Sequence, residues 1–284
     1  MGVPCRWPTG TGEGRFSPSI SAERPCRQVE VMLPCNNSLV YFGKREELHM
    51  RISLKMKGLL AALVIVFSGT SAQAIEEASS IAHGGRLYDK FWGENKLATP
   101  ATTHSAFANK AGKYDKDASW RCKECHGWDY KGKDGSYGSG GHATGIVGIQ
   151  GAAGKSPDAI IAILKDKTHG YGDAQLGAQD MHDLALFVSK GQVDMSKYID
   201  YAAKKAKGDA AKGEGYFNTI CANCHGTDGK KITNAPPLGS LQNPQEMLHK
   251  VLNGQPGQNM PALRLLDPQI AVDLVAHMMT LPEK

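Results

Sequence analysis

The sequence predicts an all-α protein in which one helical unit occurs twice in tandem. The pattern Cys-x-x-Cys-His stands at residues 122–126 and again at 221–225. Each copy is followed by a glycine-rich stretch and then by two segments whose apolar residues recur at helical spacing. The repeated order of helix, Cys motif, loop, helix, loop and helix indicates an internal duplication.

The helix before each Cys motif is predicted from its apolar residues. In the second half, the sequence Gly-Glu-Gly-Tyr-Phe at 213–217 leads directly into the motif. In the first half, apolar and aromatic residues between positions 79 and 92 predict the corresponding helix, with its end near Gly93. Residues 93–121 then intervene before the motif and are predicted to form an inserted surface loop.

Later helix starts share one signature, a capping residue followed by proline at the first helical position. The three examples are Ser156-Pro157, Asn243-Pro244 and Asp267-Pro268. The last helix of each half also contains the same dipeptide, Asp183-Leu184 in the first and Asp273-Leu274 in the second. We use this dipeptide to align the two halves.

The charge balance argues against a nucleic-acid-binding protein. The net charge of +5 comes from 33 basic and 28 acidic residues. Residues 1–74 hold 9 of the basic and 5 of the acidic ones, which leaves 24 basic and 23 acidic residues, or +1, for the rest. Nucleic-acid binding needs a basic patch or stripe, and this balance supplies none.

The stretch from Met50 to Ala74 has the three parts of a secretory signal peptide. A basic start is followed by a short apolar run and by Ala-Gln-Ala at 72–74. We expect cleavage after Ala74 and export to the periplasm, because the apolar run is about half the roughly 20 residues of a membrane span. Residues 1–49 are predicted to be a non-translated or disordered upstream extension, with Met50 or Met56 as the true start.

The Cys motifs carry the chemistry. Cys-x-x-Cys-His is the attachment signal for c-type haem, in which both thiols bond to the porphyrin and the histidine ligates iron. Four of the seven cysteines, Cys122, Cys125, Cys221 and Cys224, lie in the two motifs, and the other three precede residue 50. The sequence therefore predicts two covalently bound haem c groups, with His126 and His225 as proximal ligands.

The repeated unit resembles the class I cytochrome c domain, a small all-helical fold wrapped around one haem. The resemblance covers almost all of residues 80–284 and is closer in the second half. It implies two tandem domains, at 75–195 and at 209–284. The linker at 196–208 is predicted to be partly helical around residues 198–207.

The resemblance implies Met260 as the sixth ligand of the second iron. Residues 254–262, Gly-Gln-Pro-Gly-Gln-Asn-Met-Pro-Ala, are similar to the Met-Pro loop of class I cytochromes. The other reading of a methionine is core filling, which suits methionines on helices better than one in a Gly/Pro-rich loop.

The first half lacks a Met-Pro pair, so its sixth ligand is inferred by alignment. Counting back from the shared Asp-Leu dipeptide by the spacing that reaches Met260 leads to Gly170, one position from His169. We therefore predict His169 as the sixth ligand, with His142 and His104 as the alternatives.

Two strong ligands on each iron predict low-spin haems that transfer electrons rather than bind substrate. The expected partners are redox proteins, free or in a membrane-bound electron-transfer complex. An alternative is a dihaem oxidoreductase, because the segment at 120–131 is similar to thiosulfate dehydrogenases. Those enzymes use a cysteine thiolate as a distal ligand, and the predicted mature chain has no cysteine outside the two motifs.

Overall fold

The computed structural model describes residues 54–107, 114 and 116–284, with side chains from residue 73 onward. The predicted upstream extension and the first residues of the signal peptide lie outside these ranges. The α-helices are α1 (Leu54–Glu94), α2 (Cys122–His126), α3 (Pro157–Leu164), α4 (Ala178–Leu186), α5 (Met195–Tyr198), α6 (Ala210–Ile220), α7 (Ala222–His225), α8 (Pro244–Asn253) and α9 (Pro268–Met278). Two short strands, β1 (Ile199–Asp200) and β2 (Lys205–Ala206), form an antiparallel hairpin.

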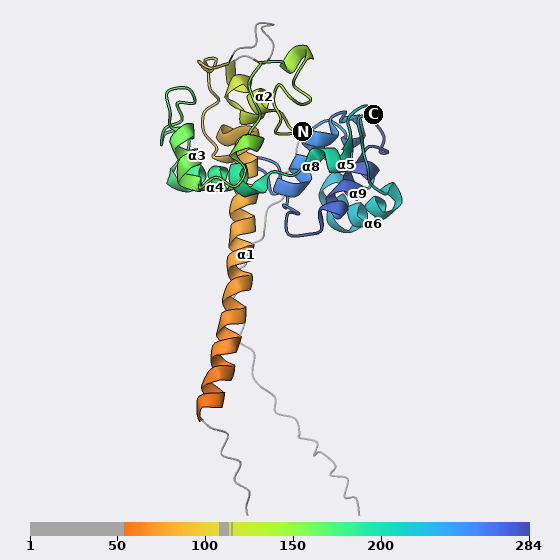
Figure 1. The fold of residues 1–284 in the computed structure, drawn as a ribbon. Helices are drawn as coiled ribbons and strands as arrows, with labels where there is room; N and C mark the ends of the chain where they lie inside the picture. Colours follow the sequence, from red (N-terminus) through yellow and green to blue (C-terminus); the bar gives the residue numbers. More distant parts are fainter. Residues whose placement is uncertain (1–53, 108–113, 115) are drawn as a thin grey trace, which may run out of the picture. The chain divides into compact units, whose positions relative to one another are not determined.

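The same helix crossing occurs in each half of the chain. The later turns of α1 pack against α4, and α6 packs against α9; Figure 1 shows α6 and α9 side by side. A glycine lies at each crossing. A Cβ on Gly84 would stand 2.1 Å from the carbonyl oxygen of Asp183, and one on Gly213 would stand 2.0 Å from that of Asp273. The aspartates that aligned the two sequences therefore occupy the same place in both crossings.

The predicted helix starts are confirmed. The side chains of Ser156, Asn243 and Asp267 accept hydrogen bonds from backbone amides in the first turns of α3, α8 and α9. Each cap satisfies an amide that has no partner inside the helix, and the proline after it lacks an amide altogether.

Two expectations about local structure need correction. The first predicted helix ends at Glu94, close to Gly93, but it begins at Leu54 and includes the predicted cleavage site, with an extended residue at Lys90. The segment at 198–207 is a hairpin rather than a helix, because α5 ends at Tyr198 and the chain turns between β1 and β2. None of the described helices is long and apolar enough to span a bilayer.

One hydrophobic core cluster contains residues from both halves. His249 on α8 lies within it and is fully buried. Its Nδ1 accepts a hydrogen bond from the hydroxyl of Tyr130 at 2.8 Å, and its Nε2 donates to the carbonyl oxygen of Gly85 at 2.9 Å. Burial lowers the pKa of His249 to about 3, so the ring is neutral and joins α8 to the first half.

Candidate functional site

The two Cys motifs adopt the same local structure. Each forms one helical turn, α2 in the first half and α7 in the second. The glycine after each histidine closes the turn. The backbone amide of Gly127 donates to the carbonyl oxygen of Lys123 at 2.9 Å, and that of Gly226 donates to the carbonyl oxygen of Ala222 at 2.8 Å. The thiols and the imidazole of each motif are thereby held on one short, closed turn.

A glycine and an aspartate complete each turn. Gly127 and Gly226 have φ angles of +78° and +76°, in the left-handed region that favours glycine. Two residues later, the carboxylates of Asp129 and Asp228 each accept a backbone amide, at 3.2 and 3.1 Å. No role was predicted for these aspartates, although the shared Gly-x-Asp after each histidine is visible in the sequence.

The motif thiols lie in apolar surroundings. Burial raises the pKa of Cys122 and Cys221 to about 11 and that of Cys125 to about 12. Cys122, Cys125 and Cys221 are partly enclosed by the protein, whereas Cys224 is exposed.

His126 is oriented by a backbone carbonyl. Its Nδ1 donates a hydrogen bond to the carbonyl oxygen of Val147 at 2.7 Å. Burial lowers the pKa of His126, which favours the neutral ring that a metal requires. Because Nδ1 is engaged, a metal would bind Nε2, and the hydrogen bond fixes both the tautomer and the ring direction.

His169 is held in a turn after α3. The carboxylate of Asp166 accepts the backbone amides of Thr168 and His169, both at 2.8 Å, and the Nδ1 of His169 at 3.2 Å. Gly170 follows with φ +65° and reverses the chain. The turn therefore leaves Nε2 of His169 as the nitrogen for a ligand.

The rings of His126 and His169 lie close together with nearly parallel planes. Their centroids lie 6.3 Å apart and their planes differ by 18°. Metal–imidazole bonds are about 2 Å long, and a bonded nitrogen lies about 1 Å from its ring centre, so two rings on one metal have centroids about 6 Å apart. The observed separation fits one metal ion bound between the two rings.

The alternative histidines of the first half have other partners. His104 is buried; its Nδ1 accepts the amide of Ala106 at 3.1 Å, and its Nε2 donates to the carbonyl oxygen of His169 at 2.8 Å. Both of its ring nitrogens are therefore engaged. His104 supports the turn of His169 from the segment predicted as an inserted surface loop, which is partly buried.

His142 lies in a different environment. Its Nδ1 donates to the carboxylate of Glu124 at 2.9 Å. Its ring stacks on Tyr114 and Tyr137, with centroid distances of 4.0 and 4.4 Å. These contacts hold the His142 ring between Glu124 and the two tyrosines.

In the second half, His225 and Met260 come from different segments. His225 ends α7 and is half-buried, and burial lowers its pKa. Met260 lies in the loop between α8 and α9, is half-buried and packs against the core cluster. The predicted Met-Pro segment is therefore a loop outside the helices, as expected for a loop ligand.

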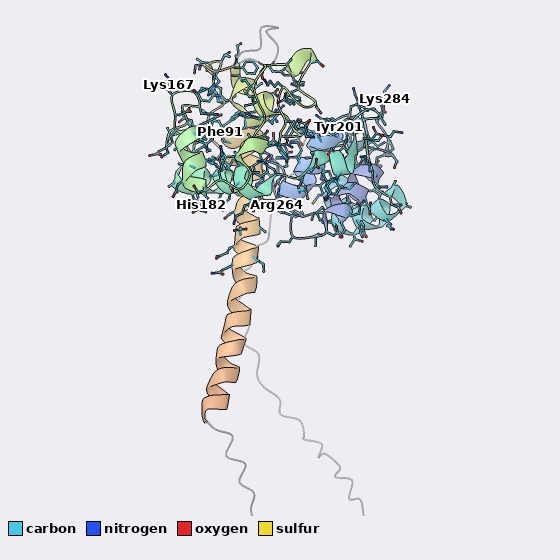
Figure 2. All side chains as sticks on the ribbon, in the orientation of Figure 1. Phe91, Lys167, His182, Tyr201, Arg264 and Lys284 are labelled. Atoms are coloured by element: carbon cyan, nitrogen blue, oxygen red, sulfur yellow. The ribbon has the colours of Figure 1, made fainter. Side chains whose placement is uncertain are left out.

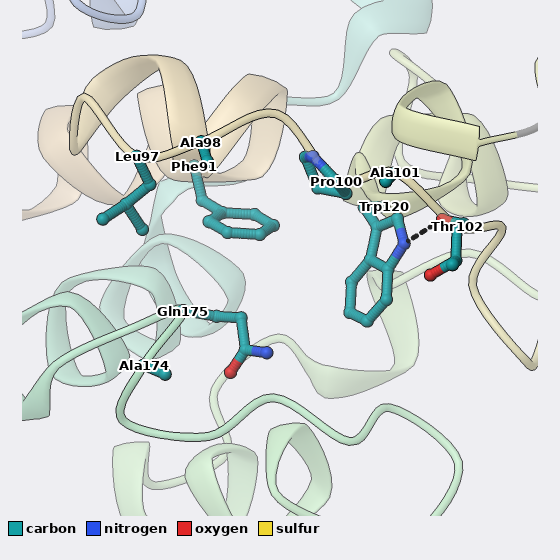
Figure 3. Close-up of a pocket in the computed structure, with 9 residues that line it drawn as sticks. All are labelled: Phe91, Leu97, Ala98, Pro100, Ala101, Thr102, Trp120, Ala174 and Gln175. Atoms are coloured by element: carbon teal, nitrogen blue, oxygen red, sulfur yellow. Dashed lines mark hydrogen bonds between the residues drawn. The ribbon is translucent and has the colours of Figure 1, made fainter.

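A cavity of about 420 Å³ lies beside the first Cys motif. Figure 3 shows Phe91 and Trp120 facing this space and Gln175 extending toward it. The indole of Trp120 donates to the carbonyl oxygen of Thr102 at 2.7 Å. Tyr171 donates to the carbonyl oxygen of Trp120 at 2.9 Å and connects this wall to the loop of His169.

A buried ionic cluster lies beside the first motif. The Trp128 ring is almost fully buried, with the charged groups of Arg121, Lys123 and Lys250 at 5.8, 5.2 and 5.5 Å from its centre. Asp89 accepts hydrogen bonds from Arg121 and Lys250, the latter at 2.6 Å. Burial alone would raise the pKa of Asp89, but the two cations outweigh it and lower the pKa to about 2. This cluster was not predicted, because Asp89 and Lys250 are distant in sequence from residues 121–128.

The comparisons with known proteins concern the second half. A protein-family model described as cytochrome C oxidase, cbb3-type, subunit III matches residues 208–278, which include the second Cys motif and Met260. No curated protein and no solved structure matches the chain. The family match supports a c-type cytochrome: an electron-transfer protein with covalently bound haem c and protein redox partners.

Proposed function

We propose that the chain is an exported dihaem c-type cytochrome that passes electrons between redox partner proteins. One haem c binds at Cys122 and Cys125, and a second at Cys221 and Cys224. The equal geometry of α2 and α7, including the glycine turn and the aspartate after each histidine, supports the same attachment role for both motifs.

The facing imidazoles of His126 and His169 carry the proposal for the first haem. The separation of the ring centres fits an iron ion bound between them, and because Nδ1 of each ring is engaged, Nε2 is the nitrogen left for the metal. We assign His126 as the proximal and His169 as the distal ligand. When bound, haem supplies reversible one-electron chemistry between ferrous and ferric iron.

The second haem is proposed to have His225 and Met260 as axial ligands. Support comes from the place of Met260 in a loop between α8 and α9 and from the family match across this segment. With His126 and His169 holding one iron and His225 and Met260 the other, no ligand position would remain for a small substrate. This arrangement favours electron transfer over substrate turnover.

The mature protein is proposed to begin after Ala74 and to reside in the periplasm. The signal-peptide pattern at 50–74 supports this, and two covalent haem groups would be attached after export. The redox partners are proteins, either free or in a membrane-bound electron-transfer complex.

Haem counting tests the proposal. Purified mature protein should contain two haem c groups by pyridine haemochrome, and Cys221→Ala/Cys224→Ala should contain one. Both haems should show low-spin spectra that thiosulfate does not change. A single haem in the wild-type protein would refute the dihaem proposal, whereas oxidation of thiosulfate with turnover would place the chain with the thiosulfate dehydrogenases.

A further inference from the structure

The loop that carries Met260 is fastened to the first half of the chain. Asn253, at the end of α8, is fully buried, and its carbonyl oxygen accepts Nη1 of Arg86 at 3.0 Å. Its side-chain oxygen accepts Nε and Nη2 of Arg264 at 3.1 and 2.6 Å; Figure 2 labels Arg264. Asn253 precedes Met260 and Arg264 follows it, so the chain on both sides of Met260 is joined at Asn253. Arg86 of α1 binds the backbone carbonyl oxygen of the same residue.

The carboxylate of Glu94 forms a second attachment. One oxygen accepts Nε of Arg86 at 2.7 Å, and the other accepts the backbone amide of Gly257 at 2.7 Å. Glu94 is largely buried, so both hydrogen bonds are protected from water. Hydrogen bonds to a charged group are about twice as strong as neutral ones. The end of α1 therefore holds the loop three residues before Met260.

Close backbone contact leaves this part of the loop little freedom. Gly257 has φ +69°, and a Cβ there would stand 2.4 Å from the carbonyl oxygen of Gly93. Gly254 has φ +92°, with its Cβ position 2.8 Å from the carbonyl oxygen of Met260. Both positions require glycine, and a side chain at 257 would separate the loop from α1.

We infer that Glu94 and Arg86, in the first half of the chain, are positioning residues that hold Met260 on the second iron. The inference rests on the proposed His225/Met260 ligation. Neither residue touches the metal. They act by stabilising the closed loop, so ligation in the second half depends on contacts made by the first half.

Ligand displacement measures this effect. Added imidazole binds ferric iron only when the loop opens and Met260 leaves, so its apparent affinity reports the open fraction. Glu94→Gln keeps the size of the side chain but removes its charge. It also replaces one of the two oxygens that accept hydrogen bonds with an NH₂ group. We expect this substitution to raise the apparent imidazole affinity of the second haem about ten-fold. The first haem should keep its spectrum.

Gly257→Ala tests the same contact from the loop. Its Cβ would push the loop away from Gly93, so this variant should also raise the imidazole affinity of the second haem. Glu77→Gln is the matched control, because Glu77 lies on α1 and pairs with Lys190 away from the loop. If Glu94→Gln and Gly257→Ala bind imidazole no more tightly than Glu77→Gln, the inference is wrong.

A further variant separates this inference from the proposed ligation. Met260→Ala should abolish the weak long-wavelength absorption of a methionine–ferric haem bond. If the wild-type protein lacks that absorption, or Met260→Ala retains it, the proposed ligation fails. If Met260→Ala loses this absorption but the Glu94→Gln and Gly257→Ala variants bind imidazole no more tightly than Glu77→Gln, the ligation holds and the positioning role is rejected.

Discussion

At the first Cys motif, the choice among three histidines depends on what their rings already contact. His169 faces His126 across 6.3 Å, whereas both nitrogens of His104 bind backbone groups and His142 stacks between tyrosines. Alignment to the Met260 loop predicted His169 from sequence, and the assignment stays a prediction. The alignment could not exclude the other two, because their partners come from segments distant in sequence.

Substitution of His169 tests this assignment. His169→Ala should turn the first haem from low-spin to high-spin, because the iron loses one of its two strong ligands. His142→Ala is the control and should leave the spectrum low-spin. Electron paramagnetic resonance of the ferric protein separates the two haems. A low-spin first haem in His169→Ala together with a high-spin one in His142→Ala would reverse the assignment.

Asp89 gives a pH-dependent contribution to stability. Its folded pKa of about 2 lies below the ordinary aspartate value of 3.8, so the contribution is present above pH 3.8 and is lost as the pH falls through about 2. The difference corresponds to roughly 2 kcal/mol. Asp89→Asn should cost about 3 kcal/mol at pH 7, because it leaves Arg121 and Lys250 without their buried counter-charge.

Urea unfolding at pH 7 and pH 2 measures this prediction. The gap between wild type and Asp89→Asn should narrow by roughly 2 kcal/mol at the lower pH. Asp173→Asn is the control: Asp173 is exposed and pairs with Lys165 at 3.2 Å, a surface contact worth less than about 1 kcal/mol. An equal gap at both pH values would contradict the role of the Asp89 charge.

Among the elements, the two helix crossings make the clearest prediction. Gly84→Ala and Gly213→Ala should each lower the free energy of unfolding by about 2 kcal/mol or more, because the new methyl group meets a carbonyl oxygen of the crossing helix. Gly215→Ala, on α6 with open space at its Cβ position, should raise it by about 0.5–1 kcal/mol. Thermal unfolding of the three variants checks this, and similar losses in all three would contradict it.

Local sequence signals predicted local structure well. Capping residues and prolines marked the starts of α3, α8 and α9, because the cap and the amides it binds are only a few residues apart. The hairpin at 199–206 was missed, since a Lys- and Ala-rich segment has the composition of a helix. Its strands have two residues each, too short for an alternating pattern.

At the scale of the whole molecule, the two halves contact each other through residues that no local sequence pattern marks. His249 reads as one polar residue of an amphipathic helix, yet it is buried between Tyr130 and Gly85. Two further contacts join the halves in the same way: Lys250 donates a hydrogen bond to Asp89, and the backbone amide of Gly257 donates one to Glu94. The family match covers residues 208–278 of the second half alone, whereas these contacts depend on how the two halves pack.

The proposed ligand sets, two histidines on the first iron and His225 with Met260 on the second, predict the direction of electron flow. Methionine stabilises ferrous iron relative to histidine, so the second haem should have the higher midpoint potential, by on the order of 0.1 V. Electrons would then pass from the first haem to the second and on to a partner protein. Spectroelectrochemical titration should resolve two waves, with the methionine-ligated haem reduced first.

Met260→His is the matched variant for this prediction. It gives both irons two imidazoles, so the potential of the second haem should fall toward that of the first and the two waves should approach each other. His182→Met is the control: His182 lies half-exposed on α4, away from the His126 and His169 pair, and its substitution should leave both waves in place. A wild-type titration in which the bis-histidine haem is reduced first would reverse the proposed direction, because transfer from the first half to the second would then be uphill.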